Sequence, residues 1–205
     1  MSNFNLIKGN CAVQNVDAVV NAANRNLRGG SGICGVIFKA CGWNTLQAAC
    51  DALNPPVKDG EAVITPAFNM KNARHIIHAV GPDFGSTPKA FLELFNAYYN
   101  SLVVLKDNNL HSISFPLISA GIFGGNLPDP AGESAKQCSR AYKKFIQDYP
   151  DYNVDVMLCA YADDEYKAAA KELGIEIEES KLSPKDCGRW DNVGIKIIDV
   201  PGNLK

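Results

Sequence analysis

The chain has 205 residues, 46% of them hydrophobic, which suits one domain with a buried core. Twenty basic and 22 acidic residues give a net charge of −2 without a run of like charges, so the usual electrostatic footprint of nucleic-acid or membrane-surface binding is missing. There is no signal-peptide pattern and no apolar stretch near the ~18 residues of a membrane span. We therefore expect a cytoplasmic monomer without a membrane or nucleic-acid partner.

Short apolar runs alternate with longer amphipathic ones, which is typical of an α/β fold. The pattern predicts strands at 4–8, 17–21, 61–65, 75–80, 112–117 and 154–161. It predicts helices at 33–41, 43–53, 88–107, 129–149 and 163–173. In the helix over 88–107, apolar residues recur at spacings of 3 and 4 and predict one core-facing stripe, formed by Phe91, Leu94, Phe95, Tyr98, Leu102 and Leu105.

After residue 174 the sequence turns polar, and only 193–200 looks like a strand. We expect a domain over 1–174 and a C-terminal extension over 175–205. The extension either adds an edge strand or docks on the body of the domain, and docking is the interpretation that we favour.

Seven cysteines are scattered without a Cys-x-x-Cys pair, at Cys11, Cys34, Cys41, Cys50, Cys138, Cys159 and Cys187. Their odd number and irregular spacing predict reduced thiols and no zinc site. His75 and His78 are oddly spaced on one predicted strand, so their side chains point to opposite faces and cannot hold the same metal. We expect neither a metal nor a cofactor.

The most informative run covers residues 16–42, where an apolar strand leads through Asn21-Ala-Ala-Asn24 into a glycine loop and a helix start. Glycines let the backbone bring its amides close to a ligand, and the helix adds free N–H groups and the positive end of its dipole. The two asparagines sit at the carboxyl end of the strand, where open α/β sheets bind ligands, and amides can hydrogen-bond sugar hydroxyls. The run therefore predicts a site for a sugar diphosphate.

This run resembles the signature of the macrodomain family, Val-Asn-Ala-Ala-Asn followed by glycines. Residues 112–125, Ser-Ile-Ser-Phe-Pro-Leu-Ile-Ser-Ala-Gly-Ile-Phe-Gly-Gly, resemble the family's second phosphate loop, and His78-Ala-Val-Gly-Pro82 resembles its central strand and turn. The resemblance covers about residues 4–173. It implies a three-layer α/β/α fold with a mixed, mostly parallel sheet of about six strands, and ADP-ribose or an ADP-ribosylated protein as ligand.

The resemblance also implies which residues bind. Two loops would clasp the diphosphate and distal ribose, the first with Gly29, Gly30, Ser31, Gly32 and Ile33, the second with Ser119, Ala120, Gly121, Ile122, Phe123 and Gly124. Tyr161 would stack on adenine, while Asn10 and the amide of Cys11 would contact the adenine edge, with Asn10 standing where the family has aspartate. An ordinary glycine turn and plain packing are the alternatives for the second loop and for Tyr161.

Asn24 is the candidate for orienting the distal ribose or the attacking water, since the family's catalytic asparagine is the second of the motif. Asparagine also caps loops and tolerates left-handed backbone, so a purely structural role is the alternative. For Asn21 that alternative has about equal weight, because its amide could mainly hold the loop.

Cys34 departs from the family pattern, because protein-deacylating macrodomains commonly carry aspartate there. A thiol at a helix start could be a nucleophile with a lowered pKa, but no histidine is evident to activate it. We favour a small residue in the wall of the ribose pocket. The alphavirus macrodomains look similar at this position and include hydrolases.

Two classes of function follow. The first is an ADP-ribosyl hydrolase in which water, held by Asn24 and a ligand phosphate, attacks the distal ribose anomeric carbon and a protein carboxylate or acetate leaves. The activity would reverse mono-ADP-ribosylation of Asp and Glu or remove acetate from O-acetyl-ADP-ribose. The second is a module that recognises ADP-ribose without turning it over. An ADP-ribose-1″-phosphatase would use the same pocket.

Overall fold

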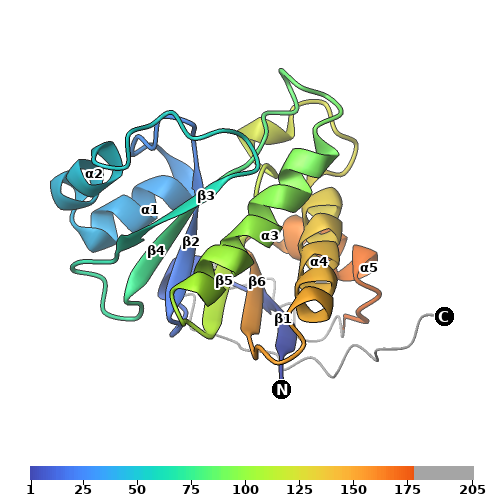
Figure 1. The fold of residues 1–205 in the computed structure, drawn as a ribbon. Helices are drawn as coiled ribbons and strands as arrows, with labels where there is room; N and C mark the ends of the chain where they lie inside the picture. The colour runs from blue at the N-terminus through green and yellow to red at the C-terminus, as the bar shows by residue number, and fades with distance from the viewer. Residues whose placement is uncertain (178–205) are drawn as a thin grey trace, which may run out of the picture.

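The computed structural model describes residues 1–177 and contains one six-stranded sheet with the order β1-β6-β5-β2-β4-β3 (Figure 1). The strands are β1 (Asn3–Lys8), β2 (Ala18–Ala23), β3 (Ala62–Pro66), β4 (His75–Val80), β5 (Ser112–Pro116) and β6 (Asp155–Ala160). Neighbouring strands are parallel except for β3, which pairs antiparallel with β4. The expected mixed, mostly parallel sheet is confirmed.

Five helices accompany the sheet: α1 (Gly32–Cys41), α2 (Trp43–Asp51), α3 (Phe91–Asp107), α4 (Pro130–Asp148) and α5 (Asp163–Glu172). Two 3-10 turns that the sequence did not predict are η1 (Cys11–Val13) and η2 (Ile122–Gly124). Every strand and helix predicted within the described residues is present, with boundaries no more than three residues from those expected. None of the helices within residues 1–177 is long and apolar enough to cross a membrane.

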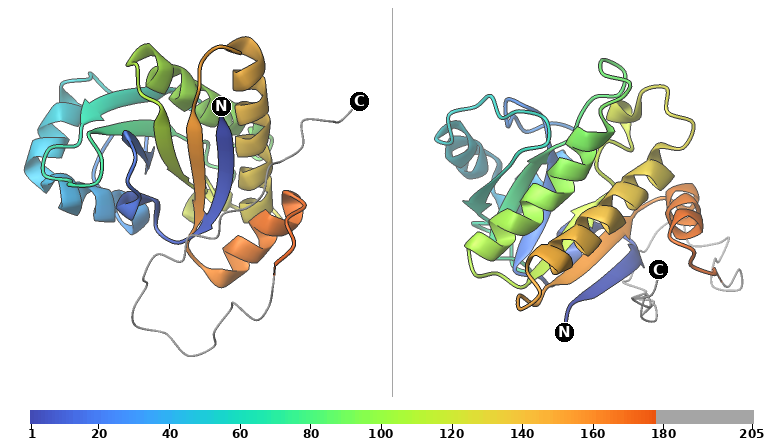
Figure 2. Two further views of the ribbon diagram at one scale, coloured as in Figure 1. Left: turned by 90° about the horizontal axis from the view of Figure 1, so that it is seen from below. Right: turned by 45° about the vertical axis from the view of Figure 1, so that its right-hand side comes forward.

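The helices form two layers, one on each face of the sheet. Helices α3 and α4 run side by side across one face, where together with α5 they bury Ala18 and Val20 of β2 (Figures 1 and 2). Helices α1 and α2 pack with η1 on the other face, over Val19 and Ala23 of the same strand. Because successive residues of a strand point to opposite faces, β2 contributes to both cores and lies at the centre of the fold.

One expectation about the periphery was wrong, and another concerns residues outside the described part of the chain. Phe91 does not belong to the buried stripe of α3: it is 37% exposed at the first turn, whereas Leu94, Tyr98, Leu102 and Leu105 are buried. The predicted strand over 193–200 and most of the extension lie outside the described residues. Within them, Ile175 and Ile177 pack against the core of α3, α4 and α5.

The two central parallel strands, β2 and β5, pair over a short distance. Their ladder joins Ala18 to Ile113 and Val19 to Ser114, although β2 continues to Ala23 and β5 to Pro116. From β2 the chain proceeds to β4 on one side and later returns to β5 on the other, so the strand order reverses between these strands. Open α/β sheets bind ligands at the carboxyl ends of strands at such a reversal.

Candidate functional site

Sequence-predicted site residues from four segments lie at one edge of the sheet. Asn10 follows β1, Asn24 follows β2, the loop over 117–129 follows β5, and Tyr161 follows β6. These four parallel strands are neighbours in the order β1-β6-β5-β2. Their carboxyl ends therefore bring segments far apart in the sequence to one place.

The loop before α1 presents exposed backbone. Gly30, Ser31 and Gly32 are exposed, and a side chain added at Gly30 or Gly32 would enter open space. Gly32 has φ of +60°, a conformation that favours glycine. The helix hydrogen bonding starts with the amide of Gly35 on the Ser31 carbonyl, at 3.3 Å, so the first amides of α1 have no intrahelical acceptor. Helix N-termini of this kind favour anions.

Gly29 has a different role from the one that the sequence suggested. Its amide donates to Oε1 of Gln47 at 2.9 Å and is not free for an anion. A Cβ at this position would lie 2.6 Å from the Trp43 ring and 2.7 Å from the Phe38 ring. Glycine is needed here for packing, and the exposed backbone that can meet a ligand begins at Gly30.

The Asn24 side chain closes a turn with the backbone of Arg28. Its Nδ2 donates to the Arg28 carbonyl at 2.8 Å, and its Oδ1 accepts from the Arg28 amide at 3.1 Å. The side chain thus performs the structural role that the sequence left open. A carboxamide has two N–H donors and two acceptor lone pairs, so one of each is left for a water or a ribose hydroxyl.

Ser119 attaches the loop after β5 to the loop after β4. This residue has φ of 58°, is buried, and donates from Oγ to the Pro82 carbonyl at 2.7 Å. The loop is joined to the one after β4 by a second bond, from the Phe84 amide to the Phe123 carbonyl at 2.9 Å. A Cβ on Gly121 would meet no atom within 4 Å, so this glycine also faces open space. Ile122 is 89% exposed on the same loop.

Cys34 is a buried thiol at the base of the glycine loop. Its Sγ contacts the Arg28 carbonyl at 3.7 Å, so Cys34 and Asn24 share one acceptor. Burial raises the pKa of this thiol, and hydrogen bonding from the Gly30 backbone and then from the Asn21 side chain opposes the rise less strongly. The lowered pKa expected of a nucleophile at a helix start is absent, which supports a wall residue.

The six described cysteines are free thiols. Among residues 1–177, no three His, Cys, Asp or Glu side chains come together in an arrangement that could hold a metal ion.

Asn21 lies inside β2 rather than at its end and is 1% exposed. Its Nδ2 is 3.2 Å from Nδ1 of His78, its partner across the β2–β4 ladder. Nε2 of His78 is 2.9 Å from Oγ1 of Thr65 and 3.7 Å from Sγ of Cys50, and burial lowers the pKa of His78 to about 4. Oδ1 of Asn21 is buried without a partner among the described residues. Asn21 therefore belongs to an internal polar network beneath α1.

The predicted adenine end is formed by the ends of β1 and β6. The side-chain oxygen of Asn10 accepts from the Ala12 amide at 2.8 Å and caps η1, so the expected acceptor already has one partner. Cys11 is buried, and its carbonyl accepts from Oγ of Ser114 at 2.8 Å. Tyr161 is 55% exposed at the end of β6.

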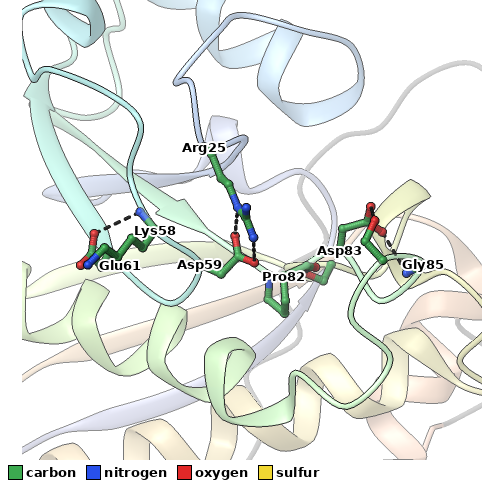
Figure 3. A network of polar contacts seen from close by, with 9 residues as sticks. Arg25, Lys58, Asp59, Glu61, Pro82, Asp83 and Gly85 are labelled. Carbon is green, nitrogen blue, oxygen red and sulfur yellow. Dashed lines mark hydrogen bonds and ion pairs between the residues drawn. The ribbon is translucent and has the colours of Figure 1, made fainter.

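An ion pair that the sequence did not reveal fixes the segment after Asn24. The guanidinium of Arg25 makes two bonds to the carboxylate of Asp59, at 2.7 and 2.6 Å (Figure 3). The Val57 amide also donates to the Arg25 carbonyl at 2.8 Å. A carboxylate that accepts two hydrogen bonds from one guanidinium is bound strongly and in a defined orientation. The loop after β2 is therefore attached to the loop before β3.

Gln47 on α2 and the pair of Arg25 with Asp59 were missed by the sequence analysis. Each connects residues that are 18 or more positions apart, and no local spacing pattern reports such contacts.

Comparison with known proteins identifies relatives of this chain. The family described as "Macro domain" matches residues 20–138. The O-acetyl-ADP-ribose deacetylase of Salmonella typhimurium is 37% identical over 152 residues, which cover 72% of this chain and 82% of that protein. The ADP-ribose glycohydrolase MACROD2 of Xenopus laevis is 33% identical over 183 residues, covering 88% of this chain.

The similarity spans different shares of these relatives. It covers 41% of MACROD2 and 26% of a Thermotoga maritima protein that is 37% identical. Among solved structures, the Oceanobacillus iheyensis macrodomain with ADP superimposes with a TM-score of 0.73 at 31% identity, over 84% of this chain and 90% of that one. The α/β/α fold is therefore shared with proteins of this kind.

Proposed function

The chain belongs to the macrodomain family, and from this premise we propose that it binds ADP-ribose and hydrolyses ADP-ribosyl esters of aspartate and glutamate side chains. The observation that carries the proposal is the exposed backbone of residues 30–32 at the start of α1, together with a second glycine loop that follows the neighbouring strand β5. Free amides and a helix N-terminus favour a diphosphate. The names of the Salmonella and Xenopus relatives support ADP-ribose derivatives as the ligand class.

The proposed orientation follows the strand order. Adenine lies at the ends of β1 and β6, near Tyr161, and the diphosphate lies between the glycine loops. The distal ribose then reaches the end of β2, beside Asn24. In this proposal Cys34 forms part of the pocket wall, and its burial and raised pKa support a wall residue over a nucleophile.

The proposed reaction needs no protein nucleophile. A water held by the remaining donor and acceptor of Asn24 and by a ligand phosphate attacks the anomeric carbon of the distal ribose. The bond from that carbon to the ester oxygen breaks, the carboxylate leaves with the bonding electrons, and a water proton passes to the phosphate oxygen. The loops contribute by holding these groups in a reactive geometry. Acetate attached at the same carbon would leave in the same way.

A non-catalytic ADP-ribose reader is the competing proposal, favoured by two observations. Cys34 stands where an acidic residue could have acted as a base, and the Asn24 amide is already bonded to Arg28 on both sides. A reader and a hydrolase bind the same ligand but differ in turnover.

The test uses two measurements on the purified protein. Titration calorimetry with ADP-ribose measures binding, and release of ADP-ribose from a protein mono-ADP-ribosylated on acidic side chains measures hydrolysis. Binding with release supports the hydrolase, and binding without release supports the reader. Absence of binding at millimolar ADP-ribose contradicts both.

A further inference from the structure

The side chain of Gln47, which projects from α2, holds two residues of the loop between Asn24 and α1. Its Oε1 accepts from the Gly29 amide at 2.9 Å, and its Nε2 donates to the Leu27 carbonyl at 3.2 Å. The same Nε2 donates to Oδ1 of Asp51 one helical turn later, at 3.0 Å. The partly buried side-chain amide of Gln47 thus bonds the loop through its oxygen and its nitrogen, and also bonds Asp51 on its own helix.

The segment held by Gln47 has a conformation that the chain does not adopt readily. Leu27 has φ of 53°, in the left-handed region that a bulky residue rarely occupies, and its side chain is 1% exposed. Such a conformation persists where the surroundings enforce it. Gln47 bonds to the carbonyl of Leu27 and to the amide two residues later, so it spans the strained turn.

Arg28 lies between these two contacts, and both its backbone and its side chain are bonded to neighbouring residues. The Arg28 backbone is bonded to the Asn24 side chain, and Nη1 of Arg28 lies 3.4 Å from Oδ1 of Asp51. Asp51 also accepts from Gln47, so α2 reaches the loop through two connected side chains. Asn24 and the exposed amides at 30–32 therefore share a support that lies outside the pocket.

We propose that Gln47 is a positioning residue for the diphosphate and distal-ribose end of the site. Gln47 engages the Gly29 amide, so that this amide does not face the ligand. It also fixes the turn at Leu27 that connects Asn24 to the exposed backbone at the start of α1. This inference rests on the proposed binding of ADP-ribose. It adds that affinity for this end of the ligand depends on a side chain of α2 that does not touch the ligand.

The test compares Gln47→Leu with the parent, using calorimetry for ADP-ribose and a chemical-shift titration for AMP. Leucine has a similar size but removes all three hydrogen bonds. AMP carries the adenine end without the diphosphate or distal ribose. We expect the dissociation constant for ADP-ribose to rise about tenfold or more and that for AMP to change less than twofold, because loss of loop geometry affects one end of the ligand.

Asn44→Leu is the matched control, because Asn44 is exposed on the same helix, and it should leave both constants unchanged.

Three outcomes overturn the inference: unchanged ADP-ribose affinity in Gln47→Leu, an equal loss for AMP and ADP-ribose, or the same loss in Asn44→Leu. Each requires a parent that binds ADP-ribose. A parent that fails to bind contradicts the proposed function instead, so the two failures are distinguishable.

Discussion

Asn24 and Arg28 form a closed hydrogen-bonded turn in which one side-chain amide satisfies both polar groups of one residue's backbone. The turn leaves Asn24 one donor and one acceptor for a ligand. It also orients this amide in the absence of a ligand. The residue proposed to orient water is therefore preorganised by the loop that carries it.

ADP-ribose should stabilise the folded chain. We expect micromolar affinity, on the order of −8 kcal/mol. Free ligand at 100 times the dissociation constant should then raise the free energy of unfolding by about 2.7 kcal/mol. Thermal unfolding at increasing ADP-ribose measures this effect, and a transition that does not move at millimolar ligand would contradict it.

Gly121→Glu should weaken ADP-ribose binding while the protein stays folded. The Cβ at this position meets open space, so the added side chain need not disturb packing. Its carboxylate would stand in the loop proposed to clasp the diphosphate, and like charges at such a range lower affinity by about tenfold or more. Calorimetry on the Glu variant and on Gly121→Gln separates charge from size. Equal affinities for these two variants would rule out the electrostatic explanation.

Cys34→Ser should retain most of the hydrolysis rate. Burial raises the pKa of the Cys34 thiol, so little thiolate exists near neutral pH, and serine is a similarly small wall residue. The rate should change by less than about tenfold, because no covalent step is lost. Steady-state hydrolysis of one ester-linked substrate measures this, and near-complete loss of turnover would instead indicate a nucleophilic cysteine.

His78 should make the fold less stable as the pH falls from about 6.5 to 4. Burial lowers its folded-state pKa to about 4, so the unfolded chain binds the proton first and stability is lost on acidification. The contribution between these pH values is about 3 kcal/mol. Urea unfolding at pH 7 and pH 4 measures it for the parent and for His78→Gln. An equally steep loss in the variant would show that other groups cause it.

The sequence predicted the sheet, the helices and the positions of both glycine loops, because hydrophobic periodicity and glycine spacing are local signals. It also predicted that Asn24 would lie at the carboxyl end of a strand. It did not predict that Asn21 pairs with His78 inside the fold, since that contact follows from the register of β2 on β4.

The hydrogen-bond partners of individual polar atoms could not be predicted from the sequence either. The Gly29 amide donates to Gln47, and the Asn10 side-chain oxygen accepts from the Ala12 amide of η1. The raised pKa of Cys34 follows from burial, and it speaks against the nucleophile alternative and for the wall residue that the sequence analysis favoured. Motifs located the site, but the hydrogen bonds that shape it depend on tertiary contacts.

The central claim is tested most directly by release of ADP-ribose from a protein mono-ADP-ribosylated on acidic side chains, comparing the parent, Asn24→Ala and Asn26→Ala. Asn26 is exposed in the same loop and serves as the control. The account predicts release by the parent and by Asn26→Ala, and a rate about 10²-fold lower for Asn24→Ala, by the scale of lost positioning. No release by the parent, or equal rates for the parent and Asn24→Ala, would contradict it.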